Sequence, residues 1–512
     1  TNTLINVSNV YVGQSGSRHS LEISNAAVVS TRNLIIGNNY RSGGIWGSNF
    51  VSVDSGARLY ATNGGSGSII FQYMTNQWMS VSNGGLVVVN GLFDIAQQAS
   101  SINHVDIGER GVLVVTNAST GDRLVVGSTG RGTLNLTGGG EITADHLYAT
   151  NGYNSVFNFS GGRLTTKSDS IIRYGTNNFA MGNDPLNAAV WEVLGGTVWV
   201  DSSAEMILGQ VVNTTGAVLV TGPSTVFTNS GRLRLGYEGL GMMTISNGAL
   251  ATVQGAILGM VSTNMPPPNM LTVSGGWFVS TNDSGEALVD IQVGAMTVSS
   301  GGSAWVDGLV ATNGRFSVLT VSGEMFVGSS TNPGPGQMRV GGEAASISNL
   351  NGVISLGGLV LGEATAQTGT VTVTGGTVTV TNPSGTAAIE VGRLGMGQYT
   401  VNGGTNLADR IYATNGADSI FVFNGGLMQS RGTRVTNGTV FGVGNGTNRA
   451  EFRALGGTHT FGDGLTVLSN GTFAGSGHLV VTGAAGALCT VGGGGTLDPA
   501  GGLTNTGNLL MQ

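Results

Sequence analysis

The sequence predicts an all-β protein that folds as a single-stranded parallel β-helix, or β-solenoid, with roughly three faces per coil and about 19 or more coils. Three observations support this fold class. Glycine supplies 90 of the 512 residues, one strand-like unit recurs along the chain, and no segment has a convincing helical pattern of apolar residues. Glycine and β-branched residues disfavour long helices, whereas a repeat of this length is typical of solenoids.

The recurring unit is an apolar–polar–apolar run, followed by Ser, Thr or Asn and then by a glycine pair. Clear copies read MSVSNGG from Met79, LTVSGG from Leu271 and VTVTGG from Val371. We count about 19 clear and weak copies, most of which begin roughly 19 to 34 residues apart. A two-residue period indicates a half-buried strand, so Leu271 and Val273 should point inward and Thr272 outward.

Three kinds of corner are expected in each coil. The glycine pair permits a turn through positive φ, and a second corner follows strands that end in glycine, such as Val125–Gly127. The third is the YATNG sequence at Tyr60, Tyr148 and Tyr412, which contains the strong turn signal Asn-Gly. Three corners predict three faces, and successive coils should hydrogen-bond to each other about 4.8 Å apart. A β-sandwich array would instead need hairpins and more aromatic residues than the 6% present.

Two places interrupt the repeat. Residues Met265–Asn269 read MPPPN, and three successive prolines cannot donate to a strand ladder, so we expect a loop there. After Phe452 the copies begin only about 13 or 14 residues apart. The predicted organisation is therefore a repetitive β-solenoid over residues 1–451 and C-terminal coils of altered cross-section over residues 452–512.

The repeat resembles a known class of bacterial surface proteins. LVVGSTGRGTLNLTGGGEIT at Leu124–Thr143 is the best local match, and Gly471–Gly483 and Gly494–Met511 are similar to closing coils of such proteins. The chain thus resembles, over nearly its whole length, the passengers of bacterial type V secretion (autotransporters) and PEP-CTERM-associated repeat proteins. That resemblance implies an extracellular or cell-surface location and a role as an adhesin, matrix component or fibre. It leaves the export route open.

Composition argues against several classes of partner and cofactor. With 20 Lys and Arg against 27 Asp and Glu, the net charge is −7, which disfavours a nucleic-acid partner. Cys489 is the single cysteine, and no stretch approaches 18 successive apolar residues, so we expect neither a disulfide nor a membrane span. No HExxH, calcium-loop or phosphate-loop motif occurs, and we predict no catalytic, cofactor or metal site. The histidines are expected at the surface or at corners: His19, His104, His146, His459 and His478.

An enzyme is the alternative hypothesis, because β-helices also carry polysaccharide lyases and glycoside hydrolases. Paired acids across a cleft would be needed. The candidate groups are Asp106 with Glu109, Asp201 with Glu205, and Asp283 with Glu286 and Asp290. Each group is flanked by turn-like sequence, which favours the interpretation of solvated corner charges.

Tryptophans supply the candidate contact surface. Trp199, Trp277 and Trp305 each follow a glycine pair; the alternation points Trp199 and Trp305 outward, whereas Trp191 is expected in the core. Outward rings are candidates for glycan stacking or a subunit contact. End coils of a solenoid also expose unpaired strand edges. The sequence therefore predicts a non-enzymatic extracellular structural protein, an adhesin or fibre subunit, that binds glycans or cell surfaces or forms a homo-oligomer or filament through its solenoid ends.

Overall fold

The structure is a computed structural model. It describes residues 3–14, 18–37, 48–62, 66–73, 75–117, 121–175, 177–202, 204–259, 269–282, 284, 286–311, 316–327, 337–340, 345–349, 353–482, 488–506 and 508–511. Met265–Pro268 of the expected proline loop and the candidate acid Asp283 lie outside the described residues.

The chain divides into two compact units. Unit 1 comprises residues 1–254 and 264–267, and unit 2 comprises residues 255–263 and 268–512. The boundary predicted between residues 451 and 452 lies within unit 2. Each unit is an all-β solenoid of short parallel strands, as predicted. In the described part of the chain the helical elements are two single 3₁₀ turns, η2 (Gly152–Asn154) and η3 (Gly416–Asp418).

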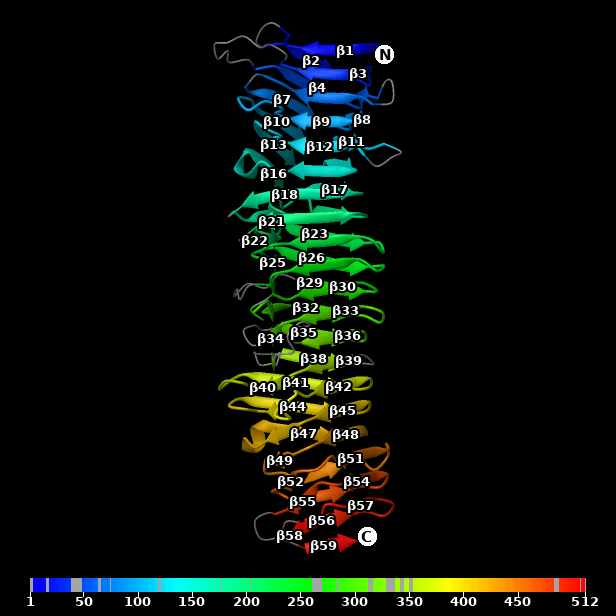
Figure 1. The fold of residues 1–512 in the computed structure, drawn as a ribbon, viewed down its shortest axis with the longest axis vertical. Helices are drawn as coiled ribbons and strands as arrows, with labels where there is room; N and C mark the ends of the chain where they lie inside the picture. Colours follow the sequence, from blue (N-terminus) through cyan, green and yellow to red (C-terminus); the bar gives the residue numbers. More distant parts are fainter. Residues whose placement is uncertain are drawn as a thin grey trace. The chain divides into compact units, whose positions relative to one another are not determined.

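Within each unit, from β4 (Phe50–Val53) onward, three strands make one turn, and most strands pair in parallel with their counterparts in the turns before and after (Figure 1). The strands of unit 1 used here are β1 (Thr3–Val12), β3 (Val28–Ile36), β4 (Phe50–Val53), β7 (Gln77–Val81), β10 (Ile102–Ile107), β13 (Arg131–Leu136), β14 (Glu141–Ala144), β15 (His146–Ala149), β16 (Ser155–Phe159), β17 (Gly162–Thr166), β18 (Ser170–Gly175), β19 (Phe179–Met181), β20 (Ala189–Val193) and β21 (Thr197–Ser202).

Unit 2 follows the same plan. Its strands used here are β30 (Trp277–Ser280), β33 (Ser303–Val306), β36 (Glu324–Val327), β42 (Thr377–Val380), β43 (Ala388–Val391), β44 (Met396–Val401), β45 (Thr405–Ala408), β46 (Arg410–Ala413), β47 (Ser419–Phe423), β48 (Gly426–Ser430), β49 (Thr433–Val435), β50 (Phe441–Val443), β51 (Ala450–Ala454), β52 (Thr458–Phe461) and β53 (Leu465–Val467).

Register explains how the repeat builds the core. In β13 and β16, Leu134 pairs with Phe157 and Leu136 with Phe159, so equivalent side chains stack from turn to turn. Inward residues such as Leu271 and Val273 are fully buried, and Thr272 between them faces outward, as predicted. Trp191 is fully buried, as expected.

The repeat motif changes face at one point in each unit. In unit 1, the copies at Leu134 and Phe157 lie in one ladder, which contains β13, β16 and β19. The next copy, at Trp191, is not in β19 but one strand later, in β20, so it lies in the adjacent ladder with β17. Unit 2 repeats this slip: Phe421 lies in β47, whose ladder contains β44, whereas Phe452 lies in β51, which pairs with β48.

The number of turns differs slightly from the predicted 19 or more coils. The reason is that copies of the motif and turns are not matched one to one. The copies at Phe452 and Leu465 lie in β51 and β53, which belong to the same turn. The short spacing after Phe452 therefore reflects two motif-like strands in one turn.

Candidate functional site

An exposed stack of aromatic rings lies on the outer face of β4, β7 and β10 in unit 1. Phe50 pairs in register with Trp78, and Trp78 pairs with His104. The ring centroids of Phe50 and Trp78 are 4.6 Å apart, and those of Trp78 and His104 are 5.5 Å apart. Trp78 remains 38% exposed. We call Phe50, Trp78 and His104 the aromatic stack; it forms because in-register strands place equal positions one above another.

A line of polar side chains begins beside the aromatic stack on β10, two residues further along the strand, and continues over the next two turns. Asp106, Asn135 and Asn158 occupy one register position on β10, β13 and β16. The Asn158 amide donates to Asn135 Oδ1 at 2.7 Å, and the Asn135 amide donates to Asp106 Oδ1. Asp106 Oδ2 accepts a hydrogen bond from Trp78 Nε1, which fixes the indole ring against the polar line. We call these three residues the amide ladder.

This face combines two kinds of recognition group. Flat exposed rings can stack on the apolar face of a ligand, while carboxylate and amide groups can bond to hydroxyls. The sequence analysis missed Trp78 because it considered tryptophans that follow a glycine pair. The sequence did contain a signal for the aromatic stack. Each of its three residues stands directly before the inward residue of a strand.

Trp199, the predicted contact residue of unit 1, faces outward from β21, as expected, and is half-buried. Its Nε1 donates to Ser230 Oγ at 2.8 Å, and the Arg173 guanidinium lies 5.2 Å from the ring centroid. Trp199 is thus held by neighbours in the adjacent turns.

The two predicted contact residues of unit 2 lie on one face. Trp277 is 47% exposed at the start of β30, and Trp305 faces outward from the neighbouring strand β33. Trp305 pairs with Val279, so it is one turn and two positions away from Trp277. Its ring packs 4.9 Å from that of Phe326 in β36. The structure therefore brings these two tryptophans onto a shared surface.

The candidate acids are engaged in local contacts. Glu205 accepts two hydrogen bonds of 2.9 Å from the Arg234 guanidinium, and Asp201 lies 3.8 Å from that of Arg173. Glu109 is exposed at a corner with a φ of 47°. Asp290 accepts a bond from Gln292 at 2.7 Å. Among the described residues, no cluster of three or more His, Cys, Asp or Glu could hold a metal ion.

The expectation that every histidine lies at the surface or at a corner is wrong for His459. It is fully buried in β52, because the strand alternation points it inward. Its ring nitrogens bond to Thr433 Oγ1 at 3.1 Å and to the Gly456 carbonyl at 3.0 Å. Burial lowers the pKa of His459, so the neutral ring is favoured. Cys489 is buried, as expected for a core residue, and burial raises the pKa of its thiol.

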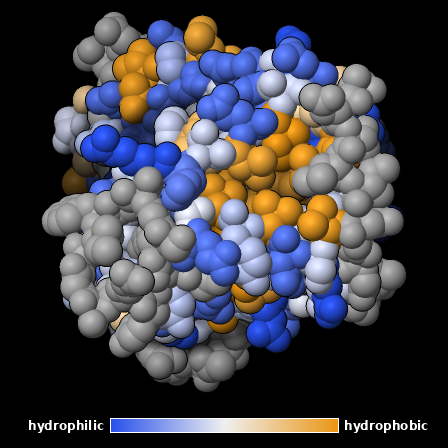
Figure 2. Space-filling view, turned by 90° about the horizontal axis from the view of Figure 1, so that it is seen from above, coloured by the Kyte–Doolittle hydropathy of each residue, from blue (hydrophilic) through white to orange (hydrophobic). Residues whose placement is uncertain are grey.

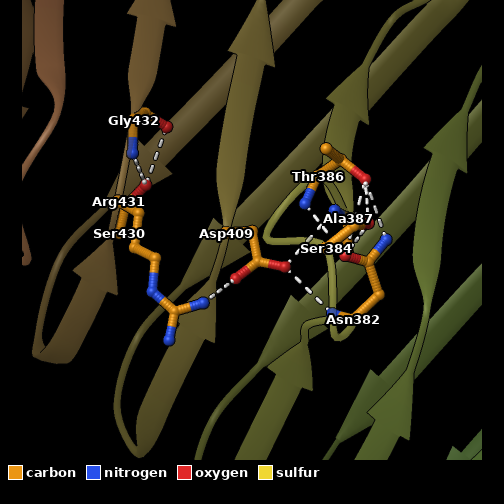
Figure 3. Close-up of polar contacts among 8 residues, drawn as sticks. All are labelled: Asn382, Ser384, Thr386, Ala387, Asp409, Ser430, Arg431 and Gly432. Carbon is orange, nitrogen blue, oxygen red and sulfur yellow. Dashed lines mark hydrogen bonds and ion pairs between the residues drawn. The ribbon is translucent and has the colours of Figure 1, made fainter.

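Buried carboxylates that the sequence analysis missed tie loops to the following turn (Figure 3). Asp409 Oδ2 accepts hydrogen bonds from the backbone N–H of Asn382 at 2.9 Å and of Ala387 at 3.3 Å. Asp307 holds the loop of the preceding turn in the same way. Its Oδ2 accepts hydrogen bonds from the backbone N–H of Asn282 at 2.9 Å and of Ala287 at 3.1 Å. We interpret these carboxylates as structural, because they replace the missing backbone partners of a loop.

Comparison with known proteins adds no family. No protein-family profile matches the chain, and no curated protein is significantly similar to it. Across the residues that the structure describes, no helix has both the length and the hydropathy needed to cross a bilayer.

Proposed function

We propose that this protein is a non-enzymatic extracellular structural protein of a bacterial surface, which acts as an adhesin or fibre subunit and binds glycans. The aromatic stack beside the amide ladder carries the proposal. Equal side chains recur about 4.8 Å apart along such a face, so an extended polymer lying on it meets similar groups at successive turns.

The chemistry of this face suits a polyhydroxylated ligand. Trp78 offers an exposed ring, and its indole N–H is already bonded to Asp106, so the ring is pre-oriented before a ligand arrives. The amide ladder supplies donors and acceptors for hydroxyl groups at the edge of that ring. Trp277 and Trp305 offer a second aromatic surface on unit 2.

Glycan binding by the full chain tests this proposal. We expect soluble oligosaccharides or immobilised polysaccharides to bind the wild type, and Trp78→Ala to weaken binding at least about tenfold, because exposed aromatic anchors dominate such contacts. Tyr153→Ala is the matched control, since Tyr153 is also exposed, at 82%, but lies away from the stack in η2. Equal binding by the wild type and Trp78→Ala would contradict the proposal. Release of shortened glycans during incubation would favour the enzyme alternative.

Self-association through a coil end is the second part of the proposal. Strand β1 pairs with β3, and Figure 2 looks onto this end of unit 1, where apolar side chains gather near the centre and hydrophilic ones border part of the patch. A second copy could add its own strands to such an edge. Electron microscopy should reveal fibres about one solenoid wide. Tyr11→Lys in β1 places a charge on the edge and should shorten them, whereas a wild type that stays monomeric at high concentration in light scattering rules out this contact.

A further inference from the structure

A segment of unit 1 recurs in unit 2. Residues 124–197, which we call copy 1, and residues 389–458, which we call copy 2, both contain YATNG followed by a strand with two phenylalanines and a glycine pair. Both segments include the face slip, and both end in LGGT. The strand after YATNG is β16 in copy 1 and β47 in copy 2.

Backbone contacts confirm that the copies correspond. Asn151 N–H donates to Ser155 Oγ at 2.9 Å in copy 1, and Asn415 N–H donates to Ser419 Oγ at 2.8 Å in copy 2. At the other end of the strand, the Phe159 carbonyl accepts from Gly182 N–H at 3.1 Å. Its counterpart in copy 2, the carbonyl of Phe423, accepts from Gly444 N–H at 2.9 Å.

At the slip, the strand of the following turn no longer pairs with the middle of β16. In copy 1, the side chain of Tyr174 occupies the resulting gap. In β16 only Phe159 pairs with β19, so the backbone of Phe157 faces a gap. The Tyr174 hydroxyl fills it: it accepts from Phe157 N–H at 2.9 Å and donates to the Phe157 carbonyl. The Tyr174 ring packs against Phe179, with centroids 5.3 Å apart. Burial raises the pKa of Tyr174 to about 12, so the hydroxyl keeps its proton.

In copy 2 a shorter side chain occupies the place of Tyr174. The inward positions Ser170 and Ile172 of β18 correspond to the buried Thr433 and Val435 of β49, and the next inward residue is Asn437. Asn437 Nδ2 donates to the Ser419 carbonyl at 2.7 Å, and Asn437 Oδ1 accepts from the N–H and the hydroxyl of Thr439, so the amide makes no hydrogen bond to Phe421.

A cavity of about 310 Å³ lies beside Asn437, lined among others by Phe421, Thr439, Val440 and Gly442. Its volume is at the lower limit for ligand pockets. Val440 is 52% exposed and gives the cavity a solvent-facing rim.

The backbone of Phe421 faces this cavity. On β47, the Ser419 and Phe423 carbonyls accept bonds from the side of the following turn. Phe421 lies between them and has the same orientation, because alternate residues of a parallel strand address the same edge. In the part of the chain that the structure describes, its N–H and C=O have no hydrogen-bond partner on this edge. Phe441, the counterpart of Phe179, is buried in the core with its ring centroid 4.9 Å from that of Phe421. The apolar side chains of Ile420, Val422 and Val440 line the cavity itself.

We propose that the cavity of copy 2 binds a phenol group. The phenol hydroxyl accepts from Phe421 N–H and donates to the Phe421 carbonyl, as the Tyr174 hydroxyl does for Phe157, and the ring lies against the apolar lining residues Ile420 and Val440. The neutral phenol is the bound form, since only it can donate this bond. A ring without a hydroxyl leaves both backbone groups unpaired, so it should bind much more weakly.

Calorimetric titration of the full chain with p-cresol and toluene tests the proposal. We expect saturable p-cresol binding with one site per chain, and at least about tenfold weaker binding of toluene. Comparison of N-acetyl-tyrosinamide with p-cresol identifies the source: tighter binding of the amide indicates the tyrosine of a peptide, and tighter binding of p-cresol indicates a small free phenol. Equal binding of p-cresol and toluene, or no saturable binding of either phenol, would overturn the proposal.

Three variants locate the site. Asn437→Tyr should fill the cavity and abolish p-cresol binding. Val440→Trp changes an exposed rim residue, preserves folding and should also block entry. Tyr174→Asn should create the equivalent cavity in copy 1 and raise the stoichiometry toward two. Retained p-cresol binding in a folded Asn437→Tyr or Val440→Trp protein would show that the phenol binds elsewhere.

Discussion

A segment that begins at Asn117 leads into copy 1, and a corresponding segment that begins at Asn382 leads into copy 2. We count each segment with its copy; the charges beside the two asparagines differ. In copy 1, Asp145 Oδ2 accepts from the backbone N–H of Asn117 at 3.0 Å. A second carboxylate, Asp122, lies in the same buried corner and accepts from the Asn117 side chain. Burial, and then the negative charge of Asp145, raises the pKa of Asp122 to about 6. Among the described residues, no base donates a hydrogen bond to either acid, although the charge of His146 partly offsets the rise in the pKa of Asp122.

In copy 2 the negative charge at the corresponding corner is balanced by an arginine. Asp409 accepts from Asn382 N–H, as Asp145 does from Asn117, but Ala387 stands in the place of the second acid. Arg431 of the following turn pairs with Asp409 (Figure 3). The comparison shows that the backbone needs one acceptor under this loop, whereas the surrounding charge is free to vary.

Removal of the acceptor should have the largest effect, and it should differ between the copies. Asp409→Ala leaves the backbone N–H groups of Asn382 and Ala387 unpaired and Arg431 without its partner, so we expect a loss of about 2 to 3 kcal/mol in the free energy of unfolding. Asp145→Ala also removes the repulsion on Asp122 and should cost only about 1 kcal/mol. Urea unfolding, with amide exchange across residues 381–387, measures both. Equal losses would show that the charge around the acceptor is unimportant.

The second largest difference between the copies is expected in how each contributes to the pH dependence of the free energy of unfolding. The pKa of Asp122 in the folded protein, about 6, lies above its unfolded value of 3.8. Its protonated form therefore stabilises the fold below about pH 4, and this contribution is lost as the pH rises through 6. Asp122→Ala, which copies the residue of copy 2, should raise the free energy of unfolding at pH 7.5 by up to about 2 kcal/mol and have little effect at pH 4.

The converse substitution in copy 2 is the matched control. Ala387→Asp places a second acid beside Asp409 and should destabilise the protein at pH 7.5 but much less at pH 4. Denaturant midpoints of the wild type and both variants, measured from pH 4 to 8, give the comparison. A difference between wild type and Asp122→Ala that stays constant over this range would contradict the raised pKa.

The cores of the copies also differ, in one buried pair. Tyr399 in copy 2 donates from its hydroxyl to Asn406 Oδ1 at 2.6 Å, and both side chains are fully buried. Copy 1 has Leu134 and Ile142 at these positions. Burial raises the pKa of Tyr399, so its hydroxyl keeps the proton needed for this bond.

A double-mutant cycle tests whether this polar pair acts as a unit. Tyr399→Phe leaves Asn406 unpaired and should cost about 1 to 2 kcal/mol. The double variant Tyr399→Phe/Asn406→Leu approaches the apolar pair of copy 1 and should regain about 1 kcal/mol of that loss. Thermal unfolding of the single and double variants gives the coupling energy. Additive losses would mean that the hydrogen bond contributes nothing specific.

Local features of the fold could be predicted from the sequence because they depend on neighbouring residues. Alternation placed Leu271 inward and Thr272 outward, and the glycine pair that follows them has the expected positive φ, 71° at Gly275. The face slips could not be predicted, because they depend on which strand of the next turn carries the motif. β19 and β50, which follow the copies at Phe157 and Phe421, carry no copy, and the next one stands a strand later.

The candidate sites depend on register between turns, which one sequence does not define. Trp78 and His104 are 26 residues apart, and they form one stack only because β7 and β10 pair at that offset. Asp409 reaches Asn382 across 27 residues for the same reason. Trp199 could be found, since its outward position follows from alternation within its own strand.

The smallest difference between the copies is expected at the feature they share most closely. Ser155 and Ser419 each accept the backbone N–H of the Asn of YATNG and donate to a carbonyl of the preceding turn, with Ser155 Oγ 3.3 Å from the Gly127 carbonyl and Ser419 Oγ 2.7 Å from that of Val391. Ser155→Ala and Ser419→Ala should each cost about 1 to 1.5 kcal/mol, and the two losses should agree within about 0.5 kcal/mol. Urea midpoints of the two variants measure them. A loss confined to one copy would mean that the charged corner, and not the serine, fixes the turn that follows YATNG.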